Sequence, residues 1–241
     1  MFLKTSNNNS FRKTTFLVIV ILGVIFNAII INANTPVFTN PNADTSDYNR
    51  IESINYMDDY TTERNTYYAS FSGIGGNCTN FASQVLENGG LPFTEQTEYP
   101  TEEHWYYYTP SWGMGRTSTW PHSHWFRKHW GDVNGQGVRR SYRQTNYTVY
   151  EALNSLSDIA NNVMLGDIIQ YTDSSDGQTY HSQVVRERYN PYPFNNPYIE
   201  MAEHDGVWGD GFCSLRTFLQ NRVQVGRGND WVSVIEIKSS W

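Results

Sequence analysis

The chain has 241 residues, enough for one or two domains, with 24 acidic and 17 basic residues and a net charge of −7. The first 34 positions hold three of the basic residues and no acid, so the remainder has a net charge of −10. This acidic balance excludes the basic surface that non-specific binding to nucleic acid or to anionic membranes requires.

The N-terminal residues have the pattern of a secretory signal. Lys4, Arg12 and Lys13 precede an apolar run at residues 16–26, and small Ala33 follows it. The run is shorter than the roughly 20 apolar residues of a membrane span. We expect residues 1–34 to be a signal peptide, with an uncleaved signal-anchor as the alternative. A polar linker at 35–47 and one domain at 48–241 would follow, secreted or held on the extracellular side of the membrane. A membrane contact is expected only through an uncleaved N-terminal segment.

The first half of the domain is predicted to be helical. Apolar residues at spacings of about one turn predict a helix over 48–65. A glycine-rich loop, SGIGGN, occupies 72–77, and TNFASQVLEN at 79–88 places its apolar residues on one face of a second helix. Gly89 and Gly90 end that helix.

The second half of the domain is predicted to consist mainly of strands. The aromatic segment 91–147 has weak periodicity, with a possible helix at 122–130, and residues 149–160 predict another helix. Four strands are expected, at 167–172, 181–188, 198–204 and 231–237. The turn-forming SSDGQ should join the first two as a hairpin. Helices followed by successive strands predict an α+β domain with an antiparallel sheet.

The chain has two cysteines, Cys78 and Cys213. In an exported protein, one disulfide is the ordinary interpretation of such a pair. However, Cys78 lies at the start of the clearest helix, where free N–H groups and the helix dipole favour a thiolate. We therefore expect Cys78 to be a free, accessible nucleophile of lowered pKa, and Cys213 to be free and buried.

A thiol nucleophile needs a base and a group that orients the base. His181 opens a predicted strand and is the candidate base. His204 ends the next strand and is the candidate orienting residue, with Asp205 or a nearby amide as rivals. The order Cys, His, polar residue on helix, strand and strand suits acyl transfer.

The same residues resemble a known family. The strings GNCTNFASQVLENGG, GDIIQY and YHSQVV are similar, over about residues 48–220, to the bacterial "putative amidase domain" family of papain-like hydrolases. This group also contains CHAP-type amidases and peptidoglycan endopeptidases. The resemblance implies a papain-like fold, with a helical lobe carrying Cys78 packed on an antiparallel sheet carrying His181. The string AEHDG matches the third motif loosely at His204. Asn77 stands where the family commonly has aspartate, and its amide can donate a hydrogen bond to an oxyanion.

These residues predict a cysteine-dependent amide hydrolase that forms a thioester and needs no cofactor. Its substrate would be a peptide or a peptidoglycan-like peptide, and its partners would not include nucleic acid. Two alternatives stay open: a transglutaminase-like acyltransferase, and a degenerate hydrolase scaffold that binds a glycan or peptide. A metal site is not expected, because the spacing of His104, His122, His124 and His129 matches no usual zinc pattern.

The N-terminal pattern makes a prediction about export. The secreted protein should begin near Asn34 or later, because the basic, apolar and small-residue regions end there. Mass spectrometry of culture-medium protein measures this directly. Recovery of intact Met1 in the membrane fraction would favour the signal-anchor.

Overall fold

A computed structural model of the chain describes residues 48–72, 76–108, 115–133, 137–138, 140–190 and 196–237. All of them belong to one compact unit, Phe38–Trp241. The expected signal peptide and linker lie outside the described residues. Within the described ranges, no helix is long and apolar enough to cross a membrane.

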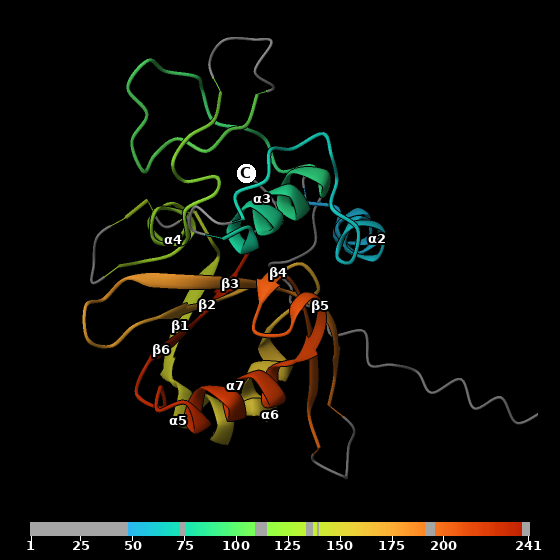
Figure 1. Ribbon diagram of the computed structural model, residues 1–241, viewed down its shortest axis with the longest axis vertical. Helices are drawn as coiled ribbons and strands as arrows, with labels where there is room; N and C mark the ends of the chain where they lie inside the picture. Colours follow the sequence, from blue (N-terminus) through green and yellow to red (C-terminus); the bar gives the residue numbers. More distant parts are fainter. Residues whose placement is uncertain are drawn as a thin grey trace, which may run out of the picture. The chain divides into compact units, whose positions relative to one another are not determined.

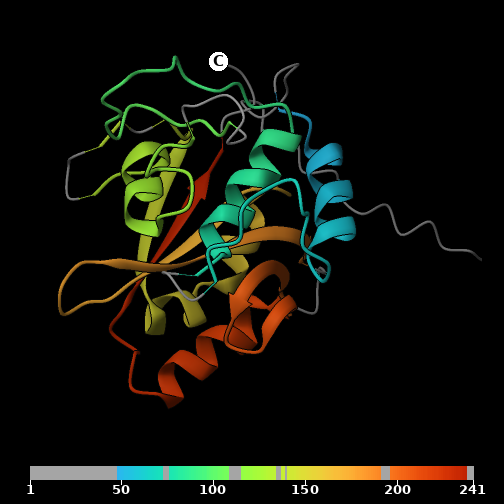
Figure 2. The ribbon, with the colours of Figure 1, turned by 45° about the horizontal axis from the view of Figure 1, so that its top comes forward.

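An antiparallel sheet of six strands forms the centre of the domain, in the order β1-β6-β2-β3-β4-β5. The strands are β1 (Arg143–Thr148), β2 (Ile168–Thr172), β3 (Thr179–Tyr189), β4 (Tyr198–Gly206), β5 (Gly209–Ser214) and β6 (Trp231–Glu236). The helices are α2 (Arg50–Tyr60), α3 (Cys78–Asn88), α4 (Ser123–Trp130), α5 (Val149–Asn154), α6 (Leu156–Asn162) and α7 (Leu215–Gln224). Figures 1 and 2 show α2, α3 and α4 on one side of the sheet and α5, α6 and α7 on the other.

Successive residues of the central strands pack into two separate cores. Ile168 and Val184 lie in the core formed with α2, α3 and α4, whereas Ile169 and Val185 lie in the core formed with α5, α6 and α7. Side chains alternate between the faces of a strand, so a sheet covered on both sides needs apolar residues at consecutive positions. This is why β2 is buried along its whole length.

The predicted α+β class with an antiparallel sheet is confirmed. Helices predicted at 48–65, 79–88 and 122–130 form as α2, α3 and α4, and the SSDGQ hairpin joins β2 to β3. The helix predicted at 149–160 forms as two shorter helices, α5 and α6, which are separated at Ser155. The sequence interpretation missed β1, β5 and α7.

The Gly-Asp pair at the start of β2 joins three elements. Gly166 has a φ of +83°, and a Cβ there would lie 2.3 Å from the Tyr48 hydroxyl, so the close approach and the backbone angle both favour glycine. Asp167 is 1% exposed and accepts hydrogen bonds from Arg50 Nη1 at 2.9 Å and from the Ile237 N–H at 3.0 Å. The pair thus ties α2 to the sheet beside the end of β6.

This junction predicts a strong effect of one substitution. Arg50→Met would leave the Asp167 carboxylate buried without its cation, and breaking a buried ion pair costs about 3–5 kcal/mol of unfolding free energy. Urea denaturation at neutral pH measures the change. As a control, Asp58→Asn removes an exposed partner of Arg186 and should cost less than about 1 kcal/mol. Equal losses in both variants would contradict the structural role of the Gly-Asp pair.

Candidate active site

Cys78 is the first residue of α3 and follows the glycine-rich loop. An N–H at the first helical position has no carbonyl partner within its helix, and the helix dipole favours negative charge there. Both cysteines are free, so the disulfide alternative does not form. The thiol was expected to be accessible, but Cys78 is only 3% exposed, because the side chains of α4 and β3 pack against it.

His181 meets Cys78 from the second residue after the start of β3. Its imidazole hydrogen-bonds to the Cys78 thiol, and its Nε2 lies 2.5 Å from Glu203 Oε2. Because Glu203 occupies Nε2, Nδ1 is the nitrogen left to exchange a proton with sulfur. The Phe218 ring of α7 stacks on the imidazole at 5.5 Å and covers its other side.

A register shift in the sheet sets the direction of His181. Tyr171 pairs with His181 while Thr172 pairs with Thr179, so Tyr180 is an extra residue on β3. Such a bulge bends a strand and re-aims the neighbouring side chain. The expected Cys78–His181 contact therefore forms at an irregular point of the sheet.

The thiol and the imidazole change each other's ionisation. Burial is the largest influence on the pKa of Cys78 and raises it, but His181, the Ser182 backbone and the Thr79 hydroxyl together outweigh burial and lower it. For His181, burial lowers the pKa, while Cys78 and Glu203 raise it to about 9. The site therefore favours a thiolate–imidazolium pair.

Glu203, and not the expected His204, contacts the His181 imidazole. Adjacent strand residues point to opposite faces, so only one of the two can reach His181. The Glu203 carboxylate also accepts a hydrogen bond from Gln183 Nε2 at 2.7 Å and lies 3.5 Å from Cys213 Sγ. These contacts hold the carboxylate against the imidazole.

His204 lies on the α3 side of β4 and does not contact His181. Its ring stacks on Phe81 at 4.1 Å, and its nitrogens bond to Asn77 Nδ2 at 2.9 Å and to the Tyr60 carbonyl at 2.8 Å. Burial lowers the pKa of His204, so the ring is neutral, accepts at Nδ1 and donates from Nε2. The expectation that His204 orients the base is wrong in this geometry.

Both ends of the Asn77 side-chain amide form hydrogen bonds. Its Oδ1 accepts from the Phe71 N–H at 3.1 Å and from Asn80 Nδ2 at 2.8 Å, and its Nδ2 bonds to His204. One of the two Nδ2 protons is used in the contact with His204, and the expected oxyanion role of the Asn77 amide stays a prediction. These contacts fix the backbone immediately before Cys78.

An acidic cluster anchors the other side of the same loop. Asp205 Oδ2 accepts from the Asn77 backbone N–H at 2.6 Å, and Asp205 also pairs with Arg64, which bonds to Asp210 at 2.7 Å. Asp205 has a φ of +50°, a left-handed conformation uncommon outside glycine. The strained backbone turns this carboxylate toward the loop that precedes Cys78.

The histidine-rich segment does not form a metal centre in the described part of the chain. No group of three or more His, Cys, Asp or Glu side chains is placed to hold a metal ion there. His129 is buried beside Trp105, donates from Nδ1 to the Glu102 carbonyl, and has a pKa lowered by burial to about 3. It is a neutral core residue.

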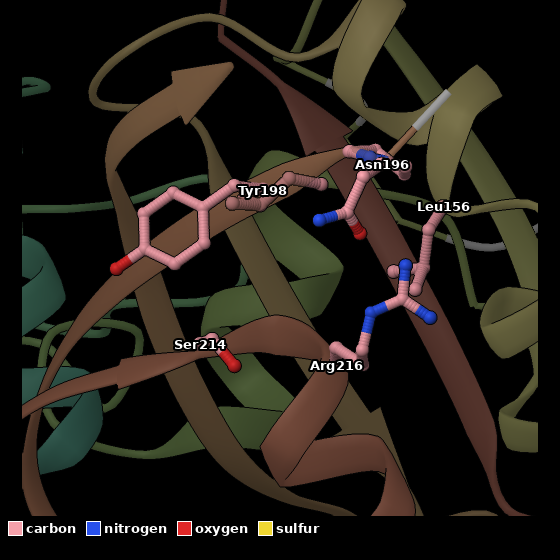
Figure 3. Close-up of a pocket in the computed structure, with 7 residues that line it drawn as sticks. Leu156, Asn196, Tyr198, Ser214 and Arg216 are labelled. Carbon is pink, nitrogen blue, oxygen red and sulfur yellow. The ribbon is translucent and has the colours of Figure 1, made fainter. Parts of the chain in front are cut away.

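A pocket is lined by residues other than those of the Cys78–His181 site. It has a volume of about 200 Å³ and is lined by Leu156, Asn196, Pro197, Tyr198, Ile199, Ser214 and Arg216. Figure 3 shows the Asn196 amide and the Arg216 guanidinium at this pocket. It contains no thiol or imidazole, so it offers none of the groups needed for nucleophilic catalysis.

The comparisons with known proteins agree with the motifs. Residues 47–220 match the family model described as "Putative amidase domain". The chain belongs to this family. The curated "Uncharacterized protein YhbB" of Bacillus subtilis (strain 168) is 28% identical over 138 residues, which is 57% of this chain and 37% of that protein. The chain thus matches just over a third of that relative's length. No solved structure matches the chain.

Sequence reasoning brought Cys78 and His181 together but missed Glu203. A signal was present in AEHDG, where the carboxylate directly precedes His204. Choosing between Glu203 and His204 required knowing which face of the strand each residue occupies. A shift of one residue in strand register exchanges the two faces.

The site predicts distinct effects for these neighbours. Glu203→Gln should lower the pKa of His181 from about 9 by about one unit or more, because the carboxylate favours the imidazolium. His204→Gln should change it much less, because His204 contacts Asn77 instead. NMR titration of the His181 ring measures both. Glu200→Gln, on the same strand but bonded to Arg186, is the matched control. A larger shift in the His204 variant would restore the original assignment.

Proposed function

We propose that this member of the amidase-domain family is a cysteine-dependent amide hydrolase, with Cys78 as nucleophile, His181 as acid and base, and Glu203 as the orienting residue. The observation that carries the proposal is the continuous contact from the thiol through the imidazole to the carboxylate. Nucleophile, base and orienting group in this order constitute a catalytic triad. The helix-borne thiol and strand-borne histidine also support the papain-like assignment.

The first half of the reaction forms a thioester. The Cys78 thiolate attacks the amide carbonyl carbon, and the C=O electron pair moves onto oxygen. The backbone N–H of Cys78, which lacks a partner within its helix, is the donor best placed for that oxyanion. As the tetrahedral intermediate collapses, the C–N bond breaks and imidazolium Nδ1 gives its proton to the leaving amine.

The second half restores the enzyme. Neutral His181 takes a proton from water, and the resulting hydroxide equivalent attacks the thioester carbonyl. The C–S bond then breaks, releasing the acid and returning the thiolate. The Glu203 carboxyl group holds Nε2 throughout, which keeps Nδ1 facing the reacting atoms.

An exposed aromatic side chain beside the site supports a substrate of extended, peptide-like form. Trp208, on the turn between β4 and β5, is 54% exposed, and its ring lies 6.4 Å from Phe218, which stacks on His181. Exposed aromatics near a reactive centre commonly contact ligands. Together with the N-terminal pattern, this favours a peptidoglycan peptide or a related amide outside the cytoplasm.

A transglutaminase-like acyl transfer uses the same first half-reaction and differs only in the group that attacks the thioester. The low exposure of Cys78 is the observation that favours it, because a site closed to water gives a bound amine the advantage. Amine incorporation and free acid formation therefore need to be measured in the same assay.

The proposal predicts the activity of three variants and its pH dependence. On peptidoglycan fragments, Cys78→Ala should abolish amide cleavage, and His181→Ala should lower kcat by about 10²–10⁴-fold through loss of proton transfer. His204→Asn should keep a measurable fraction. Wild-type kcat/KM should fall as pH rises through about 9, where His181 loses its proton, and it should also fall as pH drops below the lowered pKa of Cys78, where the thiolate is protonated.

Each arm has a clear contrary result. Hydrolysis that survives Cys78→Ala would overturn the thioester mechanism, whereas labelled amine incorporated in place of free acid would establish acyl transfer. Binding that is unchanged in Cys78→Ala, with no turnover in either form, would identify a binding protein. Circular dichroism confirms that every variant is folded.

A further inference from the structure

A cluster of hydroxyl groups lies beside the Cys78 sulfur. Cys78 Sγ is 3.8 Å from Thr79 Oγ1 and 3.9 Å from Ser123 Oγ, both within hydrogen-bonding range of sulfur. Thr79 Oγ1 is also 2.6 Å from Ser123 Oγ and 2.8 Å from Ser182 Oγ. The cluster joins α3, α4 and β3, and it is buried.

Gln170 of β2 sets the direction of the hydrogen bonds. Its side-chain amide lies 3.1 Å from the Ser123 carbonyl oxygen and 2.8 Å from Ser182 Oγ. A carbonyl only accepts, so the NH₂ group of Gln170 must face it, and that group donates to Ser182 as well. Among the described residues, Gln170 Oε1 has no partner, which agrees with an amide held for its donors.

Counting protons then fixes the rest of the chain. Ser182 Oγ accepts from Gln170, so its own proton goes to Thr79, its other partner among the described residues. Thr79 and Ser123 share one proton between them. If Thr79 donates to Ser123, the Ser123 proton is left for sulfur; if Ser123 donates to Thr79, the Thr79 proton is left for sulfur. Both arrangements direct one hydroxyl proton at Cys78.

We propose that Gln170, Ser182, Thr79 and Ser123 form a hydroxyl relay of fixed polarity that donates a hydrogen bond to the Cys78 thiolate. The inference rests on the proposed function of Cys78 as a nucleophile and identifies what stabilises it. Thr79 and Ser123 touch the reacting sulfur, whereas Ser182 and Gln170 are positioning residues. Donors fixed before the reaction stabilise charge without having to reorganise.

The other polar groups around the thiol act separately from the relay. His181 is the charged group that approaches the sulfur from β3, and the Ser182 backbone N–H bonds to it as well. On α4, Arg127 donates a hydrogen bond to Thr172 Oγ1. Three relay residues lie in the motifs themselves: Thr79 in CTNF, Gln170 in GDIIQY and Ser182 in YHSQVV. The relay thereby gives these polar positions a physical role.

The relay predicts a non-additive pair of substitutions. Thr79→Val and Ser123→Ala each leave one hydroxyl beside the sulfur, so each alone should shift the pH midpoint of Cys78 alkylation only slightly. Thr79→Val/Ser123→Ala removes both donors and should raise that midpoint by about one pH unit, the size expected for one hydrogen bond to a charged group. Brief iodoacetamide treatment across pH, with peptide mass spectrometry resolving Cys78 from Cys213, measures it.

The matched rescue is Thr79→Ser/Ser123→Ala, which keeps one hydroxyl at position 79 and should retain the wild-type midpoint. A double variant with an unchanged midpoint overturns the relay while leaving the triad intact, as does an equal rise in the rescue variant. A wild-type midpoint at the ordinary value of about 8.5 overturns both the relay and the proposed nucleophile. Circular dichroism and urea denaturation show that the compared variants are folded.

Discussion

The site depends on an ion pair between two groups that burial would keep neutral. Desolvation opposes the Cys78 thiolate and the His181 imidazolium alike, yet each charge favours the other across their hydrogen bond. Because water is largely excluded, the pair is sensitive to every fixed dipole around it. The Glu203 carboxyl group contacts the imidazole, and the hydroxyl cluster contacts the sulfur.

The surrounding fold holds the two members of the pair in place from independent directions. The loop before Cys78 is held by the Asn77–His204 bond and by Asp205. The strand that carries His181 is paired with β2, which begins at the buried Asp167 junction. A change in either anchor would move Cys78 relative to His181, so residues outside the proposed triad affect its geometry.

Sequence periodicity predicted the elements whose burial follows a simple rule. The helix predicted at 79–88 and the strand predicted at 167–172 both form, as α3 and β2. Two of the missed elements, β1 and β5, lack such signals. β1 is a polar strand at the edge of the sheet, and β5 contains two glycines within six residues, which lowers strand propensity. Helix α7 carries a signal that the sequence interpretation overlooked: Leu215, Phe218 and Leu219 recur at helical spacing on its buried face, and Ser214 caps its N-terminus.

The sequence by itself singled out Cys78 as the candidate nucleophile and His181 as the candidate base, because a cysteine at a helix start and a histidine on a strand carry local signals of position and chemistry. It did not determine what surrounds them. Glu203 and His204 are adjacent letters, and only strand orientation and the bulges of β3 and β4 decide which one reaches His181. Ser123 joins Cys78 across 45 positions of chain, and Gln170 joins Ser123 across 47. Contacts of that separation arise from packing two helices on a sheet, so tertiary structure alone assigns the groups that set the charge of the pair.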